Sequence, residues 1–223
     1  MYPDLIVTAQ SAALRVWAGT LSGDELAGDS ALPGWTVAEL LAHLVAVHDA
    51  VAGLRPTQDA EGVEPLSVAD YVLGYAGDAD RTARMARSIA RETAGDPLAA
   101  WDSAAAEARQ TLGALGAADR LVITRRGPML ASAFLTTRVI ELVVHADDLH
   151  RSVPERPAPP VLPAARQHAL TALREVLTTR DPDPQVLAAA SALDEQAFVE
   201  LATGRRAPDG ELPEPLTRAL PLL

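Results

Sequence analysis

The feature that most constrains the fold is a long apolar segment at residues 129–152 that carries one narrow stripe of charge. At about 100° per residue in an α-helix, four ionisable side chains share one side, and apolar side chains cover most of the remaining circumference. The four are Arg138, Glu141, His145 and Asp148. An ordinary surface helix has a wider polar face. The segment is therefore expected to be a buried helix whose polar stripe meets a partner on another helix.

Helical periodicity recurs along the rest of the chain. Start signals precede several segments, such as Pro3 in a first turn and the capping-box pair Thr36 and Glu39. Further helices are predicted at residues 3–18, 36–54, 67–90, 97–115, 164–177 and 187–202, with a last turn at 216–220 and a short extended run at 121–123. Long helices joined by connections of moderate length predict a mostly α protein whose first part is an up-and-down bundle.

Proline is dense between Pro154 and Pro163. Each proline ring fixes its own φ and restricts the preceding residue, so this stretch is expected to be a semi-rigid linker. We predict a helical bundle at residues 1–153, a proline-rich linker at 154–163, and a small, mainly helical C-terminal segment at 164–223.

Composition narrows the classes of function. The 223 residues carry 30 acidic and 19 basic side chains, a formal net charge of −11, which would repel a phosphate backbone and argues against a nucleic-acid partner. The chain contains no cysteine, so any thiol chemistry must come from a bound small molecule. It has no uninterrupted apolar run of about 18 residues or more and no signal-peptide pattern, so we expect no membrane partner and a cytoplasmic location.

The helix at residues 36–54 offers the best partner for the polar stripe, because its apolar surface forces at least one imidazole inward. Two histidines are available, His43 and His48. On a helical wheel His48 lies at the centre of the apolar stripe and His43 lies to its side, so periodicity slightly favours His48. Both remain candidates at this point.

Several interpretations of the polar stripe need no metal. Glu39 and His43 are four residues apart and could pair with each other, and Arg138 could form an ion pair with Glu141. Asp148 could orient the imidazole of His145, although an aspartate near a helix end is more often solvated. A histidine and a carboxylate suit zinc only when a third ligand converges on them.

Two stretches, LPGWTVAELLAHL at the second helix and TRVIELVVHADDL in the charged helix, resemble the signature segments of the mycothiol-dependent maleylpyruvate isomerase family. The resemblance implies a DinB-like up-and-down four-helix bundle with a small, mainly helical C-terminal appendage. It also implies a metal site made of His43, Glu141 and His145, and so selects His43 over His48. A shorter stretch, LATGR, resembles the family segment that carries an active-site arginine, which implies a catalytic role for Arg205.

Three protein ligands on zinc leave a fourth position vacant, which is the catalytic arrangement. The resemblance therefore implies Zn²⁺ or another divalent metal, with mycothiol or a similar small thiol as cofactor. The expected function is isomerisation or thiol transfer on a small, electrophilic, anionic substrate, by a monomer or homodimer. The alternative is a non-catalytic protein on the same bundle that binds or senses a metal or small molecule.

Overall fold

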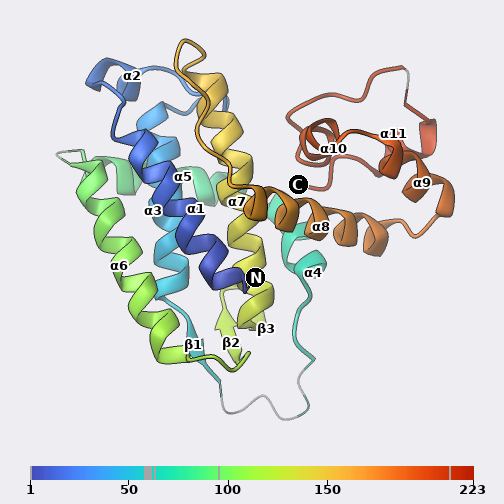
Figure 1. Cartoon of the computed structure of the whole chain (residues 1–223), viewed down its shortest axis with the longest axis horizontal. Helices are drawn as coiled ribbons and strands as arrows, with labels where there is room; N and C mark the ends of the chain where they lie inside the picture. Colours follow the sequence, from blue (N-terminus) through green and yellow to red (C-terminus); the bar gives the residue numbers. More distant parts are fainter. Residues whose placement is uncertain (1, 58–61, 63, 95, 211) are drawn as a thin grey trace.

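The computed structural model describes residues 2–57, 62, 64–94, 96–210 and 212–223, and within them the chain is mostly helical, as predicted (Figure 1). Its helices are α1 (Pro3–Ala18), α2 (Gly23–Ala27), α3 (Val37–Ala52), α4 (Val68–Leu73), the 3₁₀ helix η1 (Tyr75–Asp78), α5 (Ala79–Glu92), α6 (Pro97–Leu115), α7 (Ala131–Ser152), α8 (Pro163–Arg180), α9 (Pro184–Ala192), α10 (Glu195–Ala202) and α11 (Glu214–Ala219). The strands β1 (Arg55–Pro56), β2 (Leu121–Thr124) and β3 (Gly127–Leu130) form one antiparallel sheet in that order.

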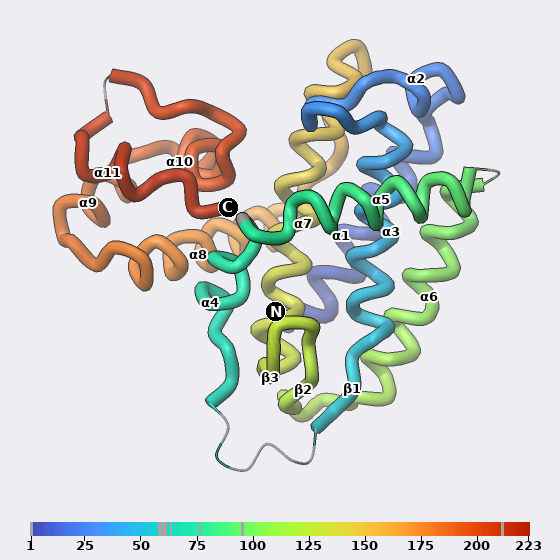
Figure 2. Tube along the Cα trace, turned by 180° about the vertical axis from the view of Figure 1, so that it is seen from behind, coloured from blue at the N-terminus to red at the C-terminus, as the bar shows by residue number. Residues whose placement is uncertain are grey.

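Four long helices, α1, α3, α6 and α7, pack together as a bundle, with the small sheet at one end (Figure 1). α1 and α7 run in one direction, and α3 and α6 run in the other. The last turns of α3 and α6 lie side by side, because Thr111 Oγ1 donates a hydrogen bond to the carbonyl of Ala52 at 3.0 Å. These two helices share a direction because the chain crosses back over the bundle through α4, η1 and α5 before α6 begins, so the bundle helices do not alternate strictly up and down as predicted. Figure 2 shows α5 lying across α3.

The core of the bundle follows the apolar faces that the sequence predicted. α7 is buried on nearly all sides: Val139, Leu142 and Leu149 are fully removed from solvent. Each such side chain contributes about 1.5–3 kcal/mol of transfer free energy. The polar stripe of α7 is thus held inside the protein by the apolar residues around it.

The helix predicted at residues 67–90 is broken at Gly74. The guanidinium of Arg126, from the turn between β2 and β3, lies over the rings of Tyr71 and Tyr75 at 4.8 and 5.2 Å. A Cβ atom at position 74 would come within 2.8 Å of Arg126 Nε. The arginine therefore occupies the space beside Gly74, where α4 ends and the 3₁₀ turn of η1 begins.

The proline-rich segment packs against α1. Gln10 bonds to it twice, donating from Nε2 to the Pro160 carbonyl and accepting from the Leu162 amide, both at 2.8 Å. Trp17 Nε1 donates to the Pro157 carbonyl at 2.8 Å. These bonds give the segment a fixed path from the bundle to α8, which packs against α7. The domain boundary at 154–163 remains a prediction.

The C-terminal part also differs in detail from the predicted helices. The segment at residues 187–202 is divided into α9 and α10, because the side chain of Asp194 caps a new helix by accepting from the amide of Ala197 at 2.9 Å. Gly204 follows α10 with a φ of 71°, a left-handed conformation that ends the helix.

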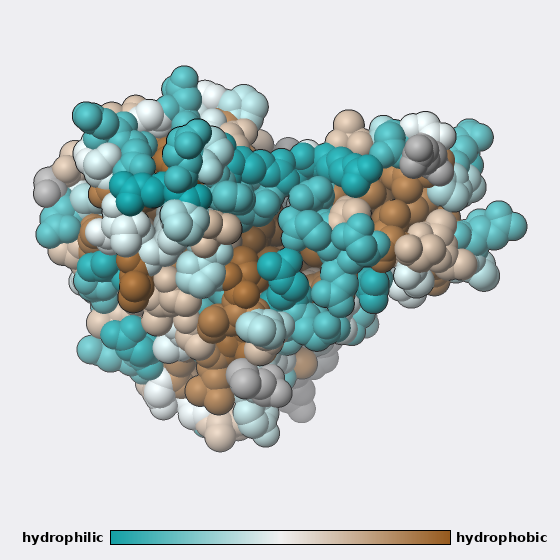
Figure 3. Space-filling view, turned by 45° about the horizontal axis from the view of Figure 1, so that its top comes forward, coloured by the Kyte–Doolittle hydropathy of each residue, from teal (hydrophilic) through white to brown (hydrophobic). Residues whose placement is uncertain are grey.

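The surface that Figure 3 presents is largely hydrophilic, with hydrophobic side chains gathered in a band along its middle and on the C-terminal part. Among the residues that the structure describes, no helix combines the length and the apolar character needed to cross a bilayer.

Candidate metal centre

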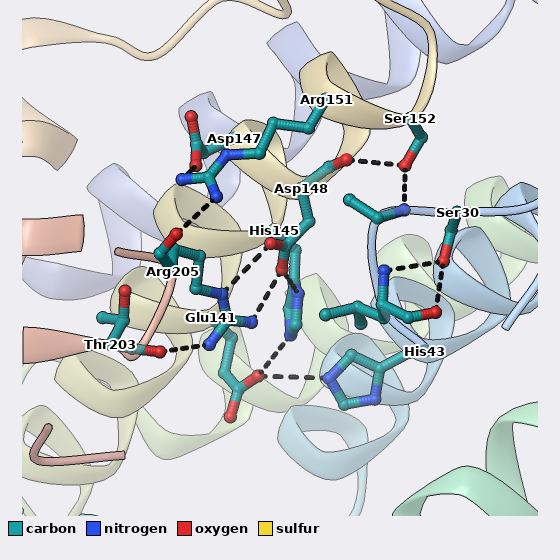
Figure 4. Close-up of polar contacts among 12 residues, drawn as sticks. Ser30, His43, Glu141, His145, Asp147, Asp148, Arg151, Ser152, Thr203 and Arg205 are labelled. Carbon is teal, nitrogen blue, oxygen red and sulfur yellow. Dashed lines mark hydrogen bonds and ion pairs between the residues drawn. The ribbon is translucent and has the colours of Figure 1, made fainter. Parts of the chain in front are cut away.

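Three of the predicted site residues converge between α3 and α7 (Figure 4). His43 projects from α3, and Glu141 and His145 project from α7 one turn apart. The Nε2 atoms of His43 and His145 each lie 3.1 Å from the same oxygen, Glu141 Oε2. One potential ligand atom from each residue lies within 4.8 Å of the others, and the side chains are only 9–12% exposed. The structure therefore places the predicted triad around one point.

The start of α3 fixes the position of His43. Thr36 and Glu39 form the predicted capping box, in which Glu39 Oε2 accepts from the Thr36 amide at 2.8 Å and Thr36 Oγ1 accepts from the Glu39 amide at 3.2 Å. The carboxylate of Glu39 is thus engaged at the helix end, and the alternative Glu39–His43 pair does not form. The ring of Trp35 packs edge-on against His43, with centroids 5.8 Å apart.

A buried aspartate orients His145 from the other side of its ring. Asp148 Oδ2 lies 2.8 Å from His145 Nδ1, and Asp148 is only 1% exposed. The solvated alternative for Asp148 is therefore wrong. The bond to Nδ1 leaves Nε2 directed at Glu141, which is how an outer carboxylate fixes a metal-binding histidine. His43 lacks such support, because its Nδ1 is buried without a hydrogen-bond partner among the described residues.

Arg205 reaches this cluster through Asp148. Its Nε and Nη2 atoms donate to the two carboxylate oxygens of Asp148 at 3.1 and 2.7 Å, and Nη1 donates to the carbonyl of Thr203 at 2.7 Å (Figure 4). This bidentate pair holds the carboxylate that in turn holds His145. A guanidinium has five N–H groups, so the three bonds leave two for another acceptor.

His48, which the helical wheel favoured, lies outside the cluster. It is 2% exposed, its Nε2 lies 2.8 Å from Ser11 Oγ, and its ring packs against Trp101 at 5.6 Å. Trp101 Nε1 donates to the same Ser11 oxygen at 3.1 Å. Burial, together with the positive charge of Arg109, lowers the pKa of His48 to about 4. His48 is therefore a neutral residue of the core.

The electrostatics of the triad differ from residue to residue. Burial lowers the pKa of His43. Burial also opposes ionisation of Glu141 and His145, but the hydrogen bonds among His43, Glu141, His145 and Asp148 outweigh it. They hold the pKa of Glu141 well below its usual value and raise the pKa of His145. Glu141 is thus an ionised carboxylate, the form that binds a metal.

Arg138, the fourth member of the polar stripe, forms only a long ion pair with Glu141. Its Nη2 lies 3.8 Å from Glu141 Oε1, which is too long for a hydrogen bond, and donates instead to the hydroxyl of Tyr75 at 2.7 Å. Its Nε donates to Thr137 Oγ1 at 3.0 Å. The expected ion pair between Arg138 and Glu141 is thus present, but it involves only one oxygen of Glu141, and the other oxygen faces two imidazoles.

The triad forms part of the wall of a cavity of about 700 Å³. Most of the lining is apolar and aromatic, and the lining cations are Arg125, Arg138 and Arg205. A cavity of this size suits a small organic ligand. The side chains of His43, Glu141 and His145 are thus accessible from a space that a small organic ligand could occupy.

A family model for the mycothiol maleylpyruvate isomerase N-terminal domain matches residues 7–150. The chain belongs to this family. The match includes His43, Glu141 and His145 and ends before Arg205. Comparisons with curated proteins and with solved structures gave no match.

The residues present fit the metal that this family implies. Two imidazole nitrogens and one carboxylate form a donor set that zinc accepts, and His145 has an outer carboxylate on its second nitrogen. Nickel, cobalt and iron accept the same donors, so the donor set alone does not select among these metals.

Sequence analysis gave no role to Tyr75 of the cavity wall and did not foresee the hydrogen bonds of Arg138. Tyr75 lies after the break at Gly74 and carries no motif. Arg138 was placed on the correct stripe, but its bonds to Tyr75 and Thr137 could not be foreseen, because the Tyr75 bond joins segments 63 residues apart.

Proposed function

We propose that this protein is a zinc-dependent enzyme that uses a low-molecular-weight thiol, mycothiol or a close equivalent, for isomerisation or thiol transfer on a small, electrophilic, anionic substrate. The observation that carries the proposal is the convergence of His43, Glu141 and His145 on one point in the wall of a 700 Å³ cavity. The family match and the absence of cysteine support a thiol from outside the chain.

A divalent metal bound by the triad would lower the pKa of a coordinated thiol and make a thiolate available to add to an electrophilic carbon. The protein's own contribution is to hold the metal-ligand side chains in position before the metal binds. Asp148 fixes the ring of His145 through Nδ1, and Arg205 fixes Asp148 through two hydrogen bonds. Because these residues are already ordered, little reorganisation is needed when ligands bind.

Arg205 is also proposed to act on the substrate. Arg205 lines the cavity, where its two remaining N–H groups could steady negative charge that develops as the thiol adds. The apolar walls exclude water, which strengthens such interactions. Arg205 thus has two separable roles, holding Asp148 and stabilising an anion.

The test is turnover of maleylpyruvate by the purified protein in the presence of mycothiol, followed by the appearance of the geometric isomer. Activity is expected to require the thiol, to disappear on treatment with a chelator and to return on addition of zinc. The Glu141→Gln variant removes the anionic ligand at nearly constant size and is expected to be inactive.

Other electrophilic acids should be tried with the same thiol if maleylpyruvate is not converted. Zinc and thiol binding without turnover of any of them would contradict an enzyme and support the non-catalytic alternative. Turnover that is unaffected by chelation or by Glu141→Gln would contradict the metal-dependent mechanism.

A further inference from the structure

The cavity contains a buried cation that the proposed mechanism does not use. Arg138 is 7% exposed, and its guanidinium lies 4.9 Å from the ring centroid of Phe134 and 5.8 Å from that of Tyr71. Burying a charge in aromatic surroundings is costly unless an opposite charge is paired with it. Arg138 has an ion pair with Glu141, but at 3.8 Å that pair is too long for a hydrogen bond and compensates the charge only in part.

The hydrogen-bond partners of Arg138 within the described residues are neutral. It donates to the hydroxyls of Tyr75 and Thr137. Its other three N–H groups have no hydrogen-bond acceptor among the residues that the structure describes. The carboxylate nearest to it on α7, Glu141, remains 3.8 Å away. When Glu141 acts as a metal ligand its charge is shared with the ion, which leaves Arg138 still less compensated.

The other two arginines of the cavity wall differ in this respect. Arg205 is paired with Asp148 at 2.7 Å, and Arg125 is paired with Asp78 at 3.0 Å. Among the described residues that line the cavity, Arg138 is the arginine without a hydrogen-bonded carboxylate. An anion entering the cavity gains most at this position.

We propose that Arg138, with Tyr75 beside it, is the carboxylate-binding subsite of the cavity. This inference rests on the proposed function, and it names the substrate class as an amphipathic monocarboxylate. The carboxylate of the substrate lies next to the metal-binding triad, because Arg138 is three residues from Glu141 on the same face of α7. The reacting carbon is consequently close to the carboxylate.

The residues that line the cavity indicate what the rest of the ligand is. Trp35, Val47, Met85, Phe134 and Ile140 line the space, and the volume of about 700 Å³ exceeds what a short acid would fill. Apolar walls favour burial of an apolar body. A substrate with a ring or a chain of several carbons therefore matches the cavity better than a compact dicarboxylate.

The experiment measures binding by calorimetry with three probes: phenylbutyrate, its neutral amide phenylbutyramide, and butyrate. Zinc-loaded wild type is expected to bind phenylbutyrate about tenfold or more tightly than the amide, since a hydrogen bond to a charged group is worth that much. It is expected to bind phenylbutyrate about tenfold or more tightly than butyrate, because the ring is buried. Equal binding in either comparison overturns the corresponding half of the proposal.

Two variants locate the anion. Arg138→Gln is expected to bind the acid and the amide alike, while Arg125→Gln, a matched loss of charge in the same cavity, keeps the preference. A preference lost in Arg125→Gln and kept in Arg138→Gln would overturn the assignment.

The metal-free wild type covers the case in which Arg138→Gln fails to fold. If Arg138 holds the carboxylate, the preference for acid over amide survives chelation. If the preference vanishes with the metal, the carboxylate binds the ion and the proposal is wrong. Metal content measured separately distinguishes the two ideas, because wild type that takes up no zinc contradicts the proposed function while the carboxylate preference can still be measured.

Discussion

Two buried imidazoles on α3, five residues apart, lie in opposite kinds of surroundings. His43 faces α7, where it meets the ionised Glu141 and a second imidazole at the wall of a large cavity. His48 faces α1 and α6, where Trp101 donates to Ser11 and Ser11 pairs with the imidazole. The group around His43 is a convergent set of metal-ligand atoms that includes a charged carboxylate. The group around His48 is a short series of hydrogen bonds between neutral side chains.

The difference shows that burial of a polar residue is a poor guide to function. His48 is the more deeply buried of the two, at 2% against 8% exposure, yet its Nε2 is paired with Ser11 within the core. His43 and His145 both face Glu141 Oε2, and a cation can bind where two imidazoles and a carboxylate converge in this way. The predictions below test this contrast, beginning with the largest effect.

The largest effect is expected from the α7 side of the triad. Glu141→Gln or His145→Ala leaves two ligands, and the metal content measured by elemental analysis should fall from about one ion per chain to near zero. His150→Ala is a matched control, because His150 lies on the same helix outside the cluster. Full metal content in Glu141→Gln would show that the triad does not bind the ion.

The pH dependence of stability should separate the two imidazoles next. The pKa of His48 falls from 6.5 to about 4 on folding, so the unfolded chain takes up a proton in this range while the folded protein does not. Stability contributed by keeping His48 neutral is complete above pH 6.5, and about 3 kcal/mol of it is lost as the pH falls towards 4.

Denaturant unfolding of wild type and His48→Gln at several pH values measures this loss. The variant should show the shallower dependence between pH 6.5 and 4. Parallel curves for the two proteins would mean that His48 is not held neutral by the core.

A smaller effect is expected at the carboxylate behind His145. Asp148→Asn keeps the size of the side chain but removes the charge that fixes the imidazole and pairs with Arg205. Metal affinity, measured by competition with a chelator, should fall about 10–100-fold. Asp147→Asn is the control, because Asp147 pairs with Arg151 on the helix surface. Equal affinities in the two variants would argue against an orienting role for Asp148.

The smallest effect is expected at the hydrogen bonds that join Trp101, Ser11 and His48. Ser11→Ala removes the atom that joins His48 and Trp101 and leaves two buried polar groups without that partner. The cost should be about 1–3 kcal/mol in unfolding free energy, with metal content unchanged. A loss of metal in this variant would mean that the two sides of α3 are coupled, and the contrast between them would fail.

The fold was largely accessible from the sequence where local patterns decide it. The bounds predicted for α1, α3, α6 and α7 agree with the structure to within two residues, because apolar periodicity and capping residues act within a few turns. The break at Gly74 was not accessible, because it depends on Arg126 from a hairpin 52 residues away. The shared direction of α3 and α6 likewise depends on the crossover through α5.

The site was accessible only in part. Wheel geometry showed that α3 buries a histidine, but it could not say which face of α3 meets α7, and the family resemblance supplied the choice of His43. Asp148 looked like a helix-end residue in solvent, because nothing near it in the sequence reveals that Arg205, 57 positions later, folds back to cover it. Long-range pairs of this kind leave no local pattern.

The most direct test of the central claim compares the metal content of wild type, His43→Ala and His48→Ala after identical purification. The account predicts about one divalent ion per chain in wild type and in His48→Ala, and almost none in His43→Ala. Metal retained by His43→Ala and lost from His48→Ala would contradict it and move the site to the other face of α3.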